Sequence, residues 1–240
     1  MAELQEQSAK IDEQINRRLE LEPAPFLSPD LQRKISGALM DSLQSVKPMP
    51  WAGVLAAQFA AVFVVFAAAL IAIMGITGFR TLNSLQAIGI VTILAVGVSL
   101  LSLVLAWQIR PGSHQKISAQ LSWACFGLGF LTGAALLFPW RGAEAFVSLG
   151  WPCFLMGSAI AIPGALLFWL LTRRGVPLSA GTFGGTLGAI AGLLGLTVLQ
   201  FRCVHQDAAH LLVWHGGVLF LSIAIGVLAA IAIERVVHYR

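Results

Sequence analysis

Six apolar runs, each about twenty residues long, limit what this chain can fold into, because a helix of that length crosses the hydrocarbon core of a bilayer. Backbone polar groups in hydrocarbon must be paired within helices or closed barrels, so an open sheet cannot replace them. Only 11% of the residues are charged, against about a quarter in soluble domains. The sequence therefore predicts an all-α polytopic membrane protein whose six transmembrane helices cover 51–77, 85–109, 121–138, 146–171, 178–201 and 211–237.

The first fifty residues are polar and differ from the rest of the chain. Eight of the eleven acidic residues precede Trp51. We expect two parts: a short cytoplasmic helical arm over residues 1–50, and a six-helix transmembrane bundle over residues 51–240. The N-terminal stretch lacks the apolar core and the small-residue cleavage site of a signal peptide, so none is expected.

Lys and Arg residues are divided unevenly between the two sides of the predicted bundle. Twelve of the fifteen fall in the arm, in the second and fourth connections and in the C-terminal tail, whereas Arg80, Arg141 and Arg202 fall on the opposite side. Cytoplasmic segments are enriched in these residues. Both termini are therefore predicted to be cytoplasmic, and the segment between the fifth and sixth spans is predicted to face outward.

The second half of the arm has the pattern of an amphipathic helix, after a first helical stripe at 4–19 and a proline-rich break at 22–29. Ser28 is suited to cap this helix and Pro29 to its first position. The apolar stripe that follows consists of Leu31, Ile35, Leu39, Leu43 and Val46. An arm of this length has too few large apolar residues for a core of its own. Two interpretations stay open: a helix on the lipid surface, or a helix that binds in a groove of a partner protein, which the acidic lead-in favours.

The predicted spans contain almost no ionisable residues, which transporters and pumps normally keep deep in the membrane. The fifth span instead has Gly184, Gly188 and Gly192 at intervals of four, a pattern typical of close helix packing. No phosphate-binding loop, dinucleotide fingerprint, metalloprotease motif or nucleophile elbow occurs in the sequence. We therefore expect a passive bundle without enzymatic activity.

Two of the three cysteines are predicted to lie at the same outer end of the bundle. Cys153 falls early in the fourth span and Cys203 follows the fifth, and these two spans are antiparallel neighbours. A disulfide needs Cα atoms within about 7 Å of each other. The sequence does not give that distance, so a pair and two thiols that never meet both stay open. Cys125, in the third span, is interpreted as a small apolar filler.

The segment 201–215 adds further side chains that bind metal ions. After Cys203 come His205, Asp207, His210 and His215, which offer imidazole and carboxylate donors beside a thiolate, a mixture suited to zinc or copper. The spacing is not a standard ligand pattern, and histidines five residues apart do not share a face of an α-helix. The simpler interpretation is that most of these residues cap the sixth span and contact headgroups, with Asp207 at the N-cap.

The order of these elements resembles the NrsF family of membrane-bound anti-sigma factors, which have a short cytoplasmic arm and six spans. The resemblance rests on three pieces of sequence: Trp151-Pro152-Cys153, Cys203, and His210 through Trp214-His215. One difference is Val204, which stands where the family has proline.

This resemblance implies a negative regulator of an ECF-type sigma factor in the bacterial inner membrane. The arm would bind the sigma factor, and a thiol, metal or oxidant event at Cys153 and Cys203, the sensing pair, would release it. No direct contact with nucleic acid and no permanent cofactor are expected, although a metal ion could bind transiently. The alternatives are a small multipass transporter or metal-handling membrane protein, and a structural scaffold in which both cysteines are dispensable.

Overall fold

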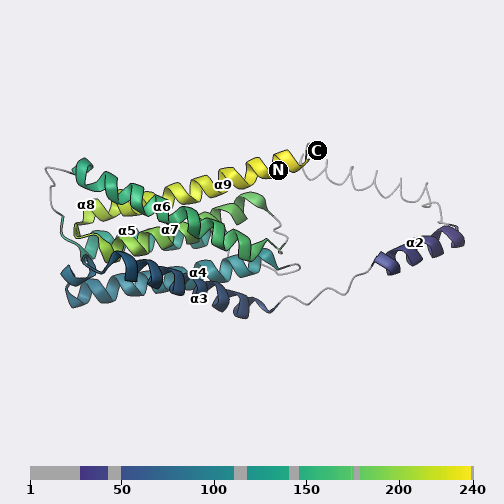
Figure 1. Cartoon of the computed structure of the whole chain (residues 1–240), viewed down its shortest axis with the longest axis horizontal. Helices are drawn as coiled ribbons and strands as arrows, with labels where there is room; N and C mark the ends of the chain where they lie inside the picture. Colours follow the sequence, from purple (N-terminus) through teal and green to yellow (C-terminus); the bar gives the residue numbers. More distant parts are fainter. Residues whose placement is uncertain are drawn as a thin grey trace, which may run out of the picture. The chain divides into compact units, whose positions relative to one another are not determined.

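The computed structural model describes residues 28–42, 50–110, 118–140, 146–173, 175 and 179–238 (Figure 1). Its elements in chain order are α2 (Pro29–Ser42), α3 (Ala52–Met74), η1 (Phe79–Thr81), α4 (Ser84–Ile109), α5 (Ala119–Leu137), α6 (Phe146–Thr172), α7 (Ala180–Arg202), α8 (Ala208–His210), η2 (Leu211–His215) and α9 (Gly216–His238). Every described element is helical, as the sequence predicts. The chain divides into two units, Met1–Pro48 and Met49–Arg240, and each is described by itself.

Six helical segments in the described residues are long and apolar enough to cross a membrane. They are α3, α4, α5, α6, α7 and the segment Ala208–Val236, which joins α8, η2 and most of α9. Each coincides with one of the predicted spans, and the boundaries move by only a few residues. The number and position of the spans are therefore confirmed, and the chain is a multi-pass membrane protein.

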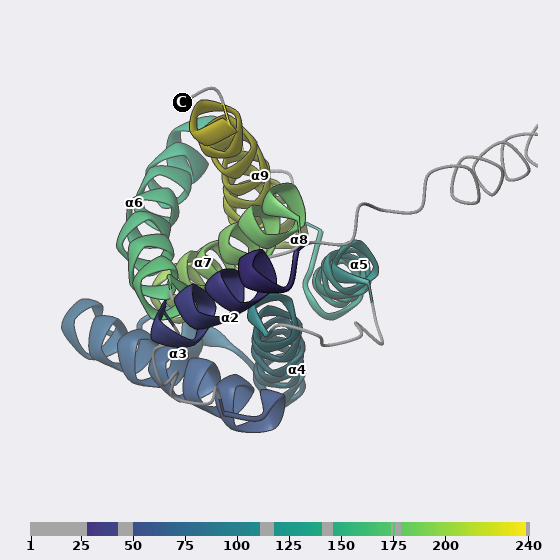
Figure 2. The ribbon, with the colours of Figure 1, turned by 90° about the vertical axis from the view of Figure 1, so that its right-hand side faces the viewer.

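Helix α7 occupies the middle of the bundle (Figure 2). Its residues are buried without interruption from Gly184 to Gln200. Glycine makes this close packing possible: a Cβ at Gly184 would overlap the carbonyl of Gly226, and a Cβ at Gly188 would overlap the carbonyl of Ser222. Helices α7 and α9 therefore meet backbone to backbone, which confirms the packing role predicted for the glycine stripe.

Helix α3 buries far fewer of its side chains against the bundle than α7 does. It buries only one stripe of side chains: Ala52, Leu55, Phe59, Phe63 and Ala67. It ends at Gly75, whose φ of 89° lies in the left-handed region that favours glycine. The chain then turns through η1 and enters α4, where Asn83 and Gln86 form a reciprocal capping box.

Helix α2 has the cap that the sequence predicts, because the Leu31 N–H donates to the Ser28 hydroxyl oxygen at 3.3 Å. Leu31 and Ile35 are exposed, so these two members of the predicted apolar stripe are available for contact. The side chain of Leu39, the whole of Leu43 and the predicted helix at 4–19 lie outside the described residues.

Cys125 does not fill the interior of the bundle, so that interpretation was wrong. The inward face of α5 carries Ser122, Phe126 and Phe130, whereas Cys125 is exposed. Adjacent residues of an α-helix are rotated by about 100° from each other, so Cys125 faces away from the interior while Phe126 faces into it.

A candidate metal and thiol site

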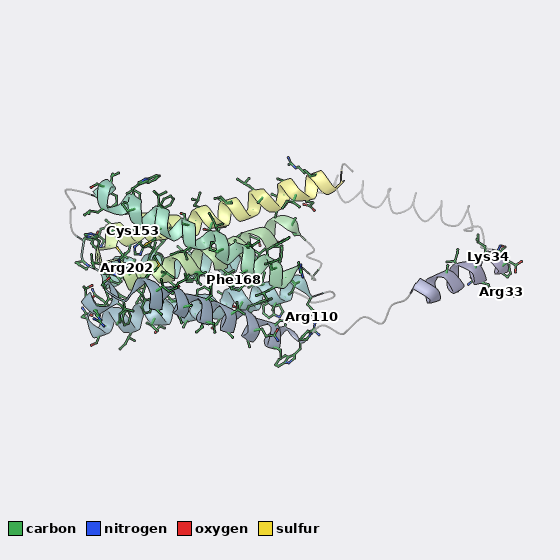
Figure 3. The ribbon with its side chains drawn as sticks, viewed as in Figure 1. Arg33, Lys34, Arg110, Cys153, Phe168 and Arg202 are labelled. Carbon is green, nitrogen blue, oxygen red and sulfur yellow. The ribbon has the colours of Figure 1, made fainter. Side chains whose placement is uncertain are left out.

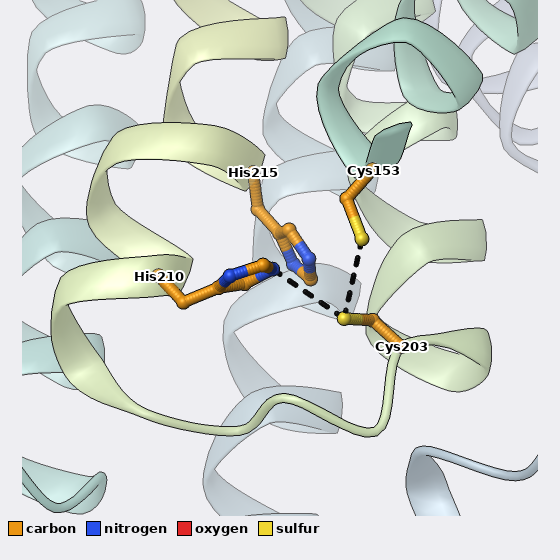
Figure 4. A group of neighbouring side chains, drawn as sticks. All are labelled: Cys153, Cys203, His210 and His215. Carbon is orange, nitrogen blue, oxygen red and sulfur yellow. Dashed lines mark hydrogen bonds between the residues drawn. The ribbon is translucent and has the colours of Figure 1, made fainter. Parts of the chain in front are cut away.

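Four side chains with metal-binding atoms converge at one end of the bundle. Cys153 lies about two turns into α6, Cys203 directly follows α7, and His210 and His215 belong to α8 and η2. Figure 3 places Cys153 beside Arg202 at this end, with Arg110 at the other end. In Figure 4 the four side chains point toward a common centre. The site therefore depends on three separate parts of the bundle.

The donor atoms of this cluster lie close enough to act together. The Sγ atoms of Cys153 and Cys203 are 3.4 Å apart, and Cys203 Sγ is also 3.4 Å from Nε2 of His210. One donor atom from each of the four residues can be chosen so that all lie within 4.8 Å of one another. Both cysteines are free thiols. Of the two possibilities left open by the sequence, the thiols do meet.

A π-helical turn brings the two histidines together. In η2 the Gly216 N–H donates to the Leu211 carbonyl, five residues earlier. Residues five apart are rotated by about 140° in an α-helix, but they lie nearly above one another where hydrogen bonds run from i to i+5. The rings of His210 and His215 accordingly have centroids 5.3 Å apart. The prediction that these histidines cannot share a face was wrong because it assumed α-helical geometry.

The segment between α7 and α8 is held in place by short-range hydrogen bonds. The side chain of Gln206 donates to the backbone carbonyls of Gln200 and Cys203 at 3.2 and 2.7 Å. Asp207 caps α8, because its Oδ1 accepts from the His210 N–H at 2.9 Å. This confirms the predicted N-cap, and it fixes the backbone on both sides of the cluster.

His205 and Asp207 were candidate ligands that remain outside the cluster. The ring of His205 is half-buried beside His210, with centroids 5.7 Å apart, and its carbonyl accepts a 3.9 Å contact from the Cys203 thiol. The sequence analysis missed Gln200 and Gln206, which bond to each other at 2.7 Å. The clue was present, since Gln200 is an amide side chain within the apolar run of the fifth span.

Three of the four side chains are shielded: Cys203 and His210 are buried and His215 has no exposed surface, whereas Cys153 is partly exposed. Neither ring nitrogen of His215 makes a hydrogen bond of good geometry among the described residues, although the Cys153 thiol lies near this ring. A buried polar group without a partner is costly, at about 1–3 kcal/mol. A buried imidazole without a hydrogen-bonded nitrogen, one of whose nitrogens lies within 4.8 Å of a donor atom on each of the other three residues, fits a ligand-binding role better than a packing role.

The hydrogen bond with Cys153 raises the pKa of the Cys203 thiol, and burial raises it further. Cys203 therefore keeps its proton in the absence of a cation. A metal ion would have to displace this proton, since thiolate is the form that ligates.

The spacing of the donors fits a small tetrahedral metal centre. Zinc lies about 2.3 Å from sulfur and about 2.0 Å from nitrogen, so neighbouring donors of a tetrahedral site are about 3.3–3.8 Å apart. Two donor pairs here, both 3.4 Å apart, fall in that range, and the two sulfurs would separate to about 3.8 Å around one zinc ion. Two cysteines and two histidines are also a common ligand set for structural zinc. The cluster can hold one such ion with small side-chain adjustments.

No protein-family model, curated protein or solved structure matches this chain.

Proposed function

We propose that this protein is a membrane-bound anti-sigma factor that senses a thiophilic metal ion or an oxidant through Cys153, Cys203, His210 and His215. The observation that carries the proposal is the convergence of these four donors at one end of the bundle. The other end is where α3 begins, directly after the N-terminal arm (Figure 1). A sensing site at the end of the bundle opposite the start of α3 suits a protein that passes information across a membrane.

The donor set selects the class of metal ion. Thiolate and imidazole are soft to borderline ligands, which favour zinc or copper(I) over magnesium or calcium. The buried site would also hold zinc as a neutral complex, because two thiolates balance the charge of a divalent ion. Neutrality is important where little solvent is available to stabilise a net charge.

An oxidant would act on the same two sulfur atoms. The two thiols would lose two electrons and two protons and form one S–S bond, while hydrogen peroxide takes up both and becomes two molecules of water. The sulfurs start 3.4 Å apart and would close to about 2.05 Å. A sulfur in a disulfide is no longer a thiolate, so oxidation and tight metal binding exclude each other.

The partner in this proposal is an ECF-type sigma factor held by the arm, residues 1–50. Support comes from the exposed Leu31 and Ile35 on α2, which present apolar surface at helical spacing. The similarity to the NrsF family supplies the kind of partner. The proposal places the protein in the bacterial inner membrane, with both termini in the cytoplasm and the cluster on the outer side, in agreement with the distribution of Lys and Arg.

Co-purification tests the anti-sigma role. The full-length chain is purified from host membranes and the bound ECF sigma factors are identified, in parallel with a Leu31→Asp/Ile35→Asp variant. We expect the wild type to retain a sigma factor and the arm variant to lose it. If the two capture the same proteins, α2 is not the binding segment, and if neither captures a sigma factor the anti-sigma role is refuted.

Release tests the sensing role. Zinc, copper(I) or hydrogen peroxide is added separately to the purified complex. Release is expected from the wild type and from Cys125→Ser, whose missing thiol lies on the exposed face of α5. The Cys153→Ser/Cys203→Ser variant should hold the sigma factor throughout. Equal release from all three proteins would show that the cluster is not the sensor.

A further inference from the structure

The connection between α3 and α4 lies directly against the chain at Cys203. The Thr77 hydroxyl donates to the Arg202 carbonyl at 2.8 Å. A Cβ at Gly78 would overlap the Cys203 backbone, and the ring of Phe79 stacks on Phe201 with centroids 4.7 Å apart. Three consecutive residues, Thr77–Phe79, thus contact three consecutive residues that end with a cysteine of the cluster.

These contacts join a rigid part of the bundle to a lightly held one. Helix α7 cannot shift easily, because a Cβ at Gly188 would overlap α9 backbone and one at Gly195 would overlap the Gly157 carbonyl of α6. Helix α3 buries a single stripe and has no comparable backbone contact among its described residues. A displacement of the Cys203 backbone will therefore move α3 more readily than it moves α7.

The π-helical turn holds one residue more than an α-helical turn would, and α9 beyond it is fixed by the glycine contacts with α7. If the turn relaxes to an α-helix, the extra residue can only move back toward the segment 203–207. That segment begins at Cys203, whose backbone is in contact with Gly78.

We infer that Thr77, Gly78 and Phe79 form a relay that passes the state of the cluster to α3, and so to the arm that precedes it. The inference rests on the proposed sensing role of the cluster, and it adds the path by which the site acts. Binding or modification at Cys203 shifts the Cys203 backbone. Thr77, Gly78 and Phe79 move with it, and α3 then shifts along the single stripe of side chains that it buries. Thr77 and Phe79 act as positioning residues, since neither contributes a donor atom to the cluster.

The test uses full-length protein in lipid nanodiscs with an environment-sensitive fluorophore attached through an azido amino acid at position 51. Trp51 precedes α3 and is exposed, so the label reports the start of this helix. The background is Cys125→Ala. The cluster is perturbed in two independent ways, by zinc alone and by alkylation with N-ethylmaleimide. Cobalt(II) absorption and the mass of the alkylated protein report the state of the cluster itself.

Thr77→Val and Phe79→Ala test the relay, and Ser99→Ala is the matched control. The Ser99 hydroxyl is exposed and donates to the Ala95 carbonyl within α4, away from the relay. We expect both perturbations to shift the label emission in the parent protein and in Ser99→Ala. In Thr77→Val the coupling should fall about fivefold, as expected for the loss of one hydrogen bond, while cobalt binding and alkylation stay unchanged. Phe79→Ala should behave in the same way.

Three results would overturn the relay. The parent protein could show no shift although its cluster is filled or alkylated; the relay variants could keep the full shift; or they could lose cobalt binding and alkylation together with the shift. The last result would mean that they only maintain the fold of the cluster. Alkylation could shift the label emission in the parent protein but not in the relay variants, while zinc does not bind. This result would support the relay and refute only the metal part of the proposed function.

Discussion

Replacing His215 by leucine should stabilise the protein without metal and remove most of its stabilisation by metal. His215 is fully buried and neither of its nitrogens is paired among the described residues. Leucine has a similar volume and no polar atoms, so the substitution should raise the free energy of unfolding of the metal-free protein by about 1–3 kcal/mol. A histidine whose ring nitrogens were hydrogen-bonded would give the opposite sign, because leucine would remove those bonds.

The effect of zinc can also be estimated. A ligand present at 100 times its Kd stabilises the folded state by about 2.7 kcal/mol. Loss of one ligand should weaken binding at least as much as loss of an outer-shell partner, about 100-fold at the upper end. At the same zinc concentration the stabilisation of His215→Leu then falls to about 0.4 kcal/mol. The substitution thus raises the free energy of unfolding without zinc but removes about 2.3 kcal/mol of the stabilisation by zinc. A general change in stability would be the same with and without zinc, so it cannot imitate this pair of results.

The assay is reversible unfolding of purified protein in mixed micelles, with a chelator or with buffered zinc. Ser102→Ala is the matched control: Ser102 is also fully buried, its hydroxyl has no partner among the described residues, and it lies about two turns from Arg110, at the other end of the bundle. It should respond to zinc like the wild type. If zinc stabilises His215→Leu as much as the wild type, His215 is not a ligand of the metal ion.

Three further predictions concern the bundle and the cluster. Gly188→Ala should destabilise the bundle by about 1–3 kcal/mol, because the added Cβ overlaps α9 backbone; Gly129→Ala, where nothing lies within 4 Å, should be neutral in the same unfolding assay. Deletion of Leu212 should convert the π turn to an α-helix with the two histidines four residues apart, so the visible absorption of bound cobalt(II) should persist; its disappearance would show that the π geometry itself is required. Diamide should form one intramolecular disulfide in Cys125→Ala, seen as a gel shift that Cys203→Ser abolishes; a shift that persists would mean that the thiols do not pair.

The class of this protein and the positions of its spans could be predicted from the sequence. The hydrocarbon thickness requires about twenty apolar residues per helix, and that requirement is local, so six runs gave six helices near their predicted positions. Short-range effects were also predictable. The caps at Ser28 and Asp207 depend on side chains that reach amides three residues away, and both are present in the structure.

The composition of the four-residue cluster could not be predicted, because it depends on how the helices pack. Spacing placed Cys153 and Cys203 near one end of the bundle, but their contact depends on how α6 and α7 pack. The alignment of His210 with His215 depends on a π-helical turn, which no propensity in the sequence indicated. Propensities describe a residue and its near neighbours along the chain. A metal-binding centre is instead defined by distances of a few ångströms between residues far apart in sequence, and helix packing sets those distances.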